Sequence, residues 1–153
     1  MSKLDNNHLR HLALEVLLND VKTISYEGRK IRKFAQTVSP SLFAEIIIHL
    51  DQRLITRFSL YTLLSLCSKN RDTNRTLKSF LDEHNMHAIT DEKQLEQIAS
   101  QAIQENAKQA ARYKTSPKKT LEVLHGQVYK KYYGRIHEDM MTEIFKRLLN
   151  KNE

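Results

Sequence analysis

The sequence predicts an all-α protein, and three of its properties lead to this class. Of its 153 residues, only two are proline and three are glycine, too few for the many tight turns of a β-protein. Apolar residues recur three and four positions apart along most of the chain, which is the spacing of one face of a helix. Hydrophobic residues make up 40% of the chain, enough for helices to pack around an apolar core.

The first helix is expected over residues 6–25, where apolar side chains keep helical spacing. Residues 26–37 are polar and basic, and we expect them to form a connection. Ser39 and Pro40 then mark a helix start, because serine caps free backbone amides and proline suits the first helical position. The apolar stripe of this helix consists of Leu42, Phe43, Ile46, Ile47 and Leu50.

Two more helices complete the first half of the chain. Thr56 stands at the N-cap of the longer one, which is expected to end in the polar stretch 68–74. A short helix follows, marked by apolar residues between positions 77 and 81. The inward positions of the longer helix are Leu60, Leu63, Leu64 and Cys67.

The chain is expected to divide into two small helical domains, residues 1–88 and 89–153. The second domain is a compact helical tail domain. It opens with Asp91 as a helix cap and Gln94 three residues later, a capping-box pattern. A short alanine-rich helix is expected over residues 107–113. The inward positions of the capped helix are Leu95, Ile98, Ala102 and Ile103.

Two longer helices end the second domain. Ser116 and Pro117 repeat the serine–proline start, and their helix is expected to run to about Tyr133. Gly134 is expected to end it, because a helix often stops at a glycine with a left-handed backbone. The inward positions of the final helix are Met141, Ile144, Phe145 and Leu148.

Positive charge is concentrated in one stretch of the second domain. The formal net charge of the chain is +7, and the stretch from Lys108 to Arg135 holds eight basic residues and one acid, Glu122. Positive charge concentrated in so short a stretch indicates a polyanionic partner, most simply nucleic acid. The alternative is a solvated, lysine-rich surface. The candidate phosphate-binding residues are Lys114, Lys118, Lys119, Lys130, Lys131 and Arg135.

Gly126 is unusual because it stands inside a predicted helix. With 100° between successive residues, it lies opposite the expected core stripe and in line with Lys119, Lys130 and Tyr133. It either leaves bare backbone where a phosphate or sugar can approach, or makes room for another helix of this protein or of a partner. Tyr129 and Tyr133 either stack on unpaired bases or cover the helix end. The core stripe consists of Leu121, Leu124, Val128 and Tyr132.

Other reactive side chains do not gather into a predicted catalytic or metal site. The histidine pairs, at positions 8 and 11 and at 84 and 87, have the spacing of one helix face but no further ligand nearby. Cys67 lies on an apolar stripe, so a buried, inert thiol is expected. A single cysteine also favours a reducing compartment. The basic group Arg29, Lys30, Arg32 and Lys33 is expected to be a solvated loop.

Several short stretches resemble one known family. Ile89-Thr90-Asp91-Glu92, Tyr113-Lys114, the run LHGQVYK from Leu124 to Lys130, and Gly134-Arg135 resemble the C-terminal tail domain of the B subunit of aspartyl/glutamyl-tRNA amidotransferase and of its small stand-alone relatives. Val38-Ser39-Pro40 resembles the helix start of that family's helical domain. The resemblance therefore covers nearly the whole chain. It departs from the family at Ile136-His137-Glu138, where the family has alanine-aspartate-proline.

The resemblance implies a tRNA-binding region that serves the amidation of misacylated tRNA in translation. It adds Gln127 and Gly134 to the candidate tRNA-binding residues, beside Gly126 and the basic residues named above. The family is a carbon–nitrogen ligase that uses glutamine as the amido donor, and its catalytic domain uses ATP and magnesium. We expect neither that domain nor those cofactors in this chain, and we expect other amidotransferase subunits as partners.

Two alternatives to a tRNA-binding role remain open. One is a helical interaction subunit whose apolar surfaces, the first helix above all, dock on a partner protein. The other is an enzyme in its own right, against which the absence of any convergent acid–base or nucleophilic set argues. No membrane association or secretion is expected. The compartment implied is the mitochondrial matrix in a eukaryote and the cytoplasm otherwise.

Overall fold

The computed structural model describes residues 6–24, 30–69 and 75–151, and every regular element in these ranges is helical. The prediction of an all-α fold is thereby confirmed. The chain divides into two compact units, an N-terminal unit of residues 1–87 and a C-terminal unit of residues 88–153. Each unit has a hydrophobic core of its own. In the described ranges, no helix combines the length and the apolarity that crossing a membrane requires.

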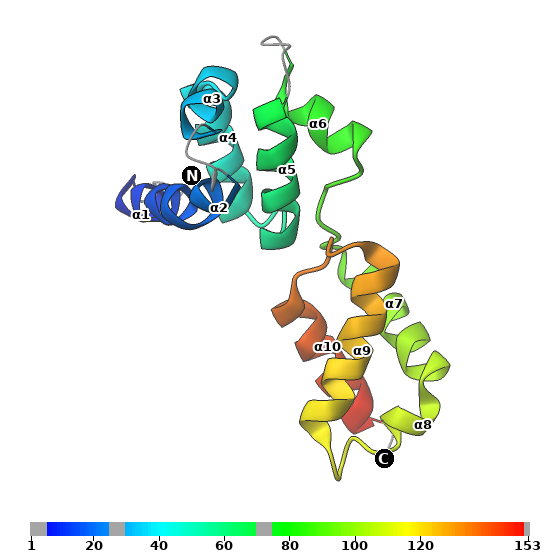
Figure 1. Cartoon of the computed structure of the whole chain (residues 1–153). Coiled ribbons are helices and arrows are strands. Elements are labelled where there is room, and N and C mark those ends of the chain that lie inside the picture. The colour runs from blue at the N-terminus through cyan, green and yellow to red at the C-terminus, as the bar shows by residue number, and fades with distance from the viewer. Residues whose placement is uncertain (1–5, 25–29, 70–74, 152–153) are drawn as a thin grey trace. The chain divides into compact units, whose positions relative to one another are not determined.

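The N-terminal unit is built around α5, which packs against α2, α3 and α4 (Figure 1). Helix α4 also contacts α1 and α6. The caps expected at two helix starts are present: the Ser39 hydroxyl accepts from the Leu42 N–H at 3.1 Å, and Thr56 accepts from Ser59 N–H at 3.1 Å. The elements are α1 (Asn6–Val16), the π-helical turn η1 (Leu17–Val21), α2 (Lys22–Ile24), α3 (Lys30–Thr37), α4 (Pro40–Asp51), α5 (Arg57–Lys69) and α6 (Leu77–Glu83).

The structure corrects the prediction in two places of this unit. Residues 30–37 form helix α3 and not a connection, because Phe34 and Val38 are buried in the core. The expected first helix is interrupted by η1, whose wider turn lets Val16 and Val21, five residues apart, both be buried. The four basic side chains at positions 29, 30, 32 and 33 lie outside the described residues.

The sole cysteine is buried in the N-terminal core, as expected. The side chain of Cys67 is 1% exposed and packs with the core residues of α5 and α6. Burial raises the pKa of its thiol to about 11, against a smaller opposing effect of the Arg75 charge. The thiolate is the reactive form of cysteine, so this side chain acts as a small core residue.

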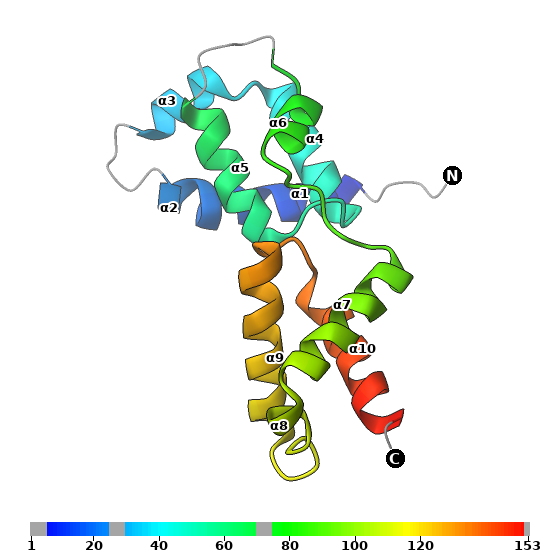
Figure 2. The same cartoon turned by 90° about the vertical axis from the view of Figure 1, so that its right-hand side faces the viewer.

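Three long helices and one short helix form the C-terminal unit (Figure 2). Helix α7 packs against both α9 and α10, which also contact each other, and α8 joins α7 to α9. The Asp91 cap is confirmed, because its carboxylate accepts from the Gln94 N–H at 2.8 Å. The elements are α7 (Glu92–Glu105), α8 (Ala107–Ala110), α9 (Pro117–Tyr132) and α10 (Glu138–Lys151).

The ends of α8 and α9 differ in detail from the prediction. Helix α8 ends at Ala110, and Ser116 stands at the N-cap of α9 without a side-chain capping bond. Thr120, fully buried, joins these helices instead, since its hydroxyl donates to the Gln109 carbonyl at 3.2 Å. At the other end, Gly134 has the expected left-handed backbone, with φ 69°, and Tyr133 before it is left-handed as well, with φ 50°.

Candidate nucleic-acid interface

The exposed face of α9 brings two lysines into line with Gly126. Lys119 and Lys130 are both exposed, and they stand about three turns and about 16 Å apart along the helix axis. Among the residues that the structure describes, neither lysine forms an ion pair. Gly126 lies between them on this face, so bare backbone is flanked by two available positive charges.

The space above Gly126 is open. Apart from its two chain neighbours and the backbone of its own helix, a Cβ atom built at this position meets no heavy atom within 4 Å. The glycine therefore does not make room for another helix within the described part of the chain. Two of the expected explanations remain, which are the approach of a nucleic-acid backbone and the packing of a partner protein.

Gly126→Ala is expected to raise the free energy of unfolding by about 0.5–1 kcal/mol, because alanine suits a helix interior better than glycine and no neighbour opposes its methyl group. Urea denaturation followed by circular dichroism measures the change. A matched substitution is Ser100→Ala on α7, which removes a hydroxyl without changing glycine content. A lower free energy of unfolding in Gly126→Ala would show that the folded structure itself requires the glycine.

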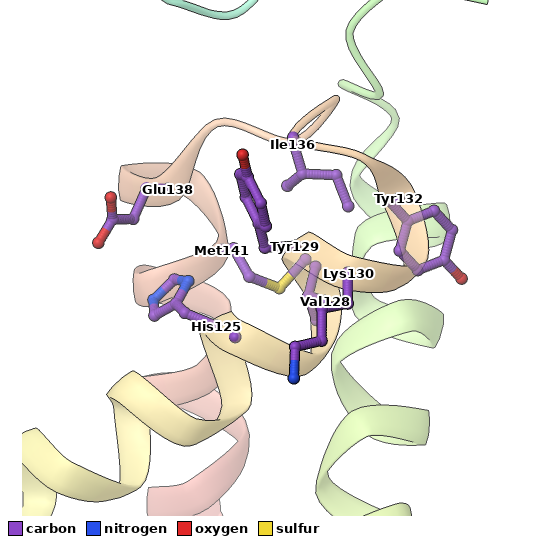
Figure 3. A pocket seen from close by; sticks show the side chains of 10 residues that line it. His125, Val128, Tyr129, Lys130, Tyr132, Ile136, Glu138 and Met141 are labelled. Carbon is purple, nitrogen blue, oxygen red and sulfur yellow. The ribbon is translucent and has the colours of Figure 1, made fainter. Parts of the chain in front are cut away.

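A hollow of about 420 Å³ opens beside Gly126, between the end of α9 and the start of α10. In Figure 3 the Tyr129 ring stands between Ile136 and Glu138, and the Lys130 side chain extends away from Tyr129. The lining is mostly apolar, with one lysine and one glutamate at its edge. The lining residues are His125, Gly126, Val128, Tyr129, Lys130, Tyr132, Gly134, Ile136, Glu138 and Met141.

His125 is a member of this site that was not among the residues predicted from the sequence. Its Nε2 lies 2.8 Å from the Thr142 hydroxyl, and its ring meets Phe145 edge-on with the centroids 5.3 Å apart. Burial lowers the pKa of the imidazole, and the Glu138 charge opposes this shift in part. The neutral ring is therefore favoured, and His125 forms a wall of the hollow that links α9 to α10.

Gln127 and Lys131 lie on the other side of α9, toward α7. Together with Lys130 they line a second hollow of about 220 Å³. Lys131 pairs with Glu105 at 3.3 Å, which partly neutralises its charge. The structure therefore separates the LHGQVYK run into two faces, and of the candidate lysines only Lys130 lies at the edge of both hollows.

The remaining candidate residues occupy the two ends of α9. Lys114 is exposed in the turn before the helix, and Lys118 is exposed in its first turn. Gly134 is buried in the turn after the helix, where Arg135 is half-buried and its N–H donates to the Tyr132 carbonyl at 3.0 Å. Lys114, Lys118 and Arg135 line neither of these two hollows.

The tyrosines at the end of α9 differ in exposure. Tyr132 is half-buried against the core, as its place in the predicted stripe required. Tyr129 is 48% exposed and Tyr133 76% exposed. Of the two exposed rings, only Tyr129 lines the larger hollow.

The histidine pairs have other neighbours. His8 contacts Asp51 at 2.9 Å, and His87 contacts Asp82 at 2.8 Å. Among the side chains that the structure describes, no three histidines, cysteines or carboxylates gather as metal ligands would.

Comparison with known proteins gives one family. A family model described as "GatB domain" matches residues 3–149. The B subunit of aspartyl/glutamyl-tRNA(Asn/Gln) amidotransferase from Mesoplasma florum is 26% identical over 97% of this chain and 30% of its own length. The protein of that name from Methanococcus maripaludis strain C7 is 24% identical over 91% of this chain and 29% of its own. The one from Elusimicrobium minutum is 35% identical over 50% of this chain and 16% of its own.

Proposed function

Because this chain belongs to the GatB domain family, we propose that it binds tRNA through the exposed face of α9. The chain spans about 30% of the length of the Mesoplasma florum relative, whose name assigns it to tRNA amidotransferase. In this proposal the chain supplies tRNA binding for the amidation of misacylated tRNA, and the amidation takes place at a catalytic site outside this chain. Other amidotransferase subunits are its partners.

The observation that carries this proposal is the bare backbone at Gly126 between Lys119 and Lys130. Contacts to phosphate and sugar provide much of the affinity for nucleic acid. They require exposed cations and room for the backbone to approach, and the open space above Gly126 provides that room. Both lysines are exposed on the same face of the helix.

The first turn of α9 supports the same proposal. Lys118 and Lys119 stand at the N-terminal end of this helix. Because the helix dipole is positive there, cations at this end are unfavourable in an isolated protein. A bound phosphate would offset the repulsion, so the placement of these lysines suits a protein that has an anionic partner.

The test is binding of the purified chain to a labelled tRNA and to a DNA duplex of equal length over a range of salt concentrations. We expect the chain to prefer tRNA and its affinity to fall steeply with salt, because phosphate contacts release counterions. Gly126→Ala is expected to weaken tRNA binding even though it stabilises the fold. Weak binding without preference for tRNA would contradict the proposal.

The second candidate function is docking on a protein partner. Its support is the exposure of three large apolar side chains on α1 and η1, which are Leu14, Leu17 and Leu18. Exposed apolar groups of this size are typical of interaction surfaces when they are contiguous. If tRNA binding fails, light scattering after size-exclusion chromatography would measure association through this face.

A further inference from the structure

The larger hollow suits a ligand that has a flat, apolar part and a negatively charged group next to that part. Its walls include Val128, Ile136 and Met141, and the half-exposed ring of Tyr129 forms one side. A nucleotide has both parts, an aromatic base and an anionic phosphate. We propose that this hollow binds one unstacked nucleobase of an RNA chain, with Tyr129 as its stacking partner.

The proposal rests on the proposed function and makes it more specific. A base inside a duplex is covered on both faces and cannot enter a hollow, whereas bases in RNA loops can turn out and stack on aromatic side chains. The ligand is therefore a single-stranded segment, such as a loop, and not a helical stem. The hollow of about 420 Å³ falls within the size range of pockets for small ligands.

The residues around the hollow favour a base inside it and the phosphate of the same nucleotide outside it. Glu138 stands at the edge of the hollow, and its carboxylate would repel a phosphate placed inside. The Lys130 side chain extends away from Tyr129 (Figure 3), so its positive charge is placed to contact a phosphate of the strand outside the hollow. Gly126, at the edge of the same hollow, leaves room for the ribose to pass.

The experiment compares two single-stranded probes of equal length and charge, an oligoadenylate and its abasic counterpart, by fluorescence anisotropy with the full chain. Stacking of one base is expected to make the oligoadenylate bind roughly 5- to 150-fold tighter. Tyr129→Ala is expected to abolish this difference, and Tyr129→Phe to retain it. Tyr61→Ala is the matched control, because Tyr61 is 45% exposed on α5 and Tyr129 48%.

The possible outcomes separate the two proposals. If the chain binds both probes equally with a steep salt dependence, RNA binding stands and the base site is wrong. If Tyr129→Ala keeps the preference of the unaltered chain, Tyr129 is not the stacking partner and the proposal fails. If neither probe nor tRNA binds, the proposed function fails and the base site with it.

Discussion

The double charge reversal Lys119→Glu and Lys130→Glu is expected to weaken tRNA binding by about 10- to 100-fold near 0.1 M salt. Both side chains are exposed on the Gly126 face of α9. Each lost phosphate contact also lowers the slope of log affinity against log salt by about 0.7–0.9, so the slope is expected to fall by about 1.4–1.8 in total. Fluorescence anisotropy titrations at several salt concentrations measure both quantities.

The matched control for this prediction reverses two exposed lysines elsewhere, Lys78 on α6 and Lys93 on α7. Both double variants change the net charge by the same amount, so a general electrostatic attraction would weaken equally in the two. Lys131 is a poorer choice for the test, because its pairing with Glu105 at 3.3 Å would be lost at the same time. Equal slopes in the test and control variants would contradict a specific phosphate contact on this face.

Phe145→Ala is expected to destabilise the C-terminal unit by about 3–5 kcal/mol. The ring is fully buried and meets His125 edge-on, so its removal leaves a cavity and loosens one wall of the larger hollow. The two cores have no residue in common, and the N-terminal unit is therefore expected to stay folded. Urea denaturation followed by NMR resolves the residues of each unit and measures the loss.

Two substitutions in the N-terminal unit complete this experiment. Phe80→Ala removes a buried ring of that unit. It is expected to destabilise the N-terminal unit, to leave the C-terminal unit folded and to preserve tRNA binding. Phe58→Ala removes a ring that is 47% exposed and is expected to have little effect on either unit. If Phe145→Ala and Phe80→Ala each unfold the whole chain in one transition, the two units are not independent.

Most of the helices could be predicted from sequence because their apolar spacing and caps are local. Residues 30–37 are the instructive failure. Three of its eight residues are basic, and nothing local shows that Phe34 meets the Phe43 ring, 6.3 Å between centroids, in the core. The π-helical turn η1 was missed for a similar reason, since the burial of Val16 before it and of Val21 at its end depends on packing against other helices.

The candidate site was predictable only as far as one helix determines it. The helical wheel of α9 placed Gly126 outward and in line with Lys119 and Lys130, and the structure has the same arrangement. The hollow depends on the approach of α10, which brings Glu138 and Met141 to α9. His125 lies at the edge of the apolar stripe of α9. This position in the sequence was the feature that could have indicated its place in the wall of the hollow.

The burial of Cys67 has a practical consequence for chemical labelling. With a thiol pKa of about 11, only about one molecule in a thousand carries the thiolate at pH 8, and the surrounding core excludes reagents. A cysteine introduced at an exposed position such as Tyr133 would therefore take a dye or a photo-cross-linker almost alone. The natural chain thus serves as its own unreactive background for mapping which nucleotides pass each point of the α9 face.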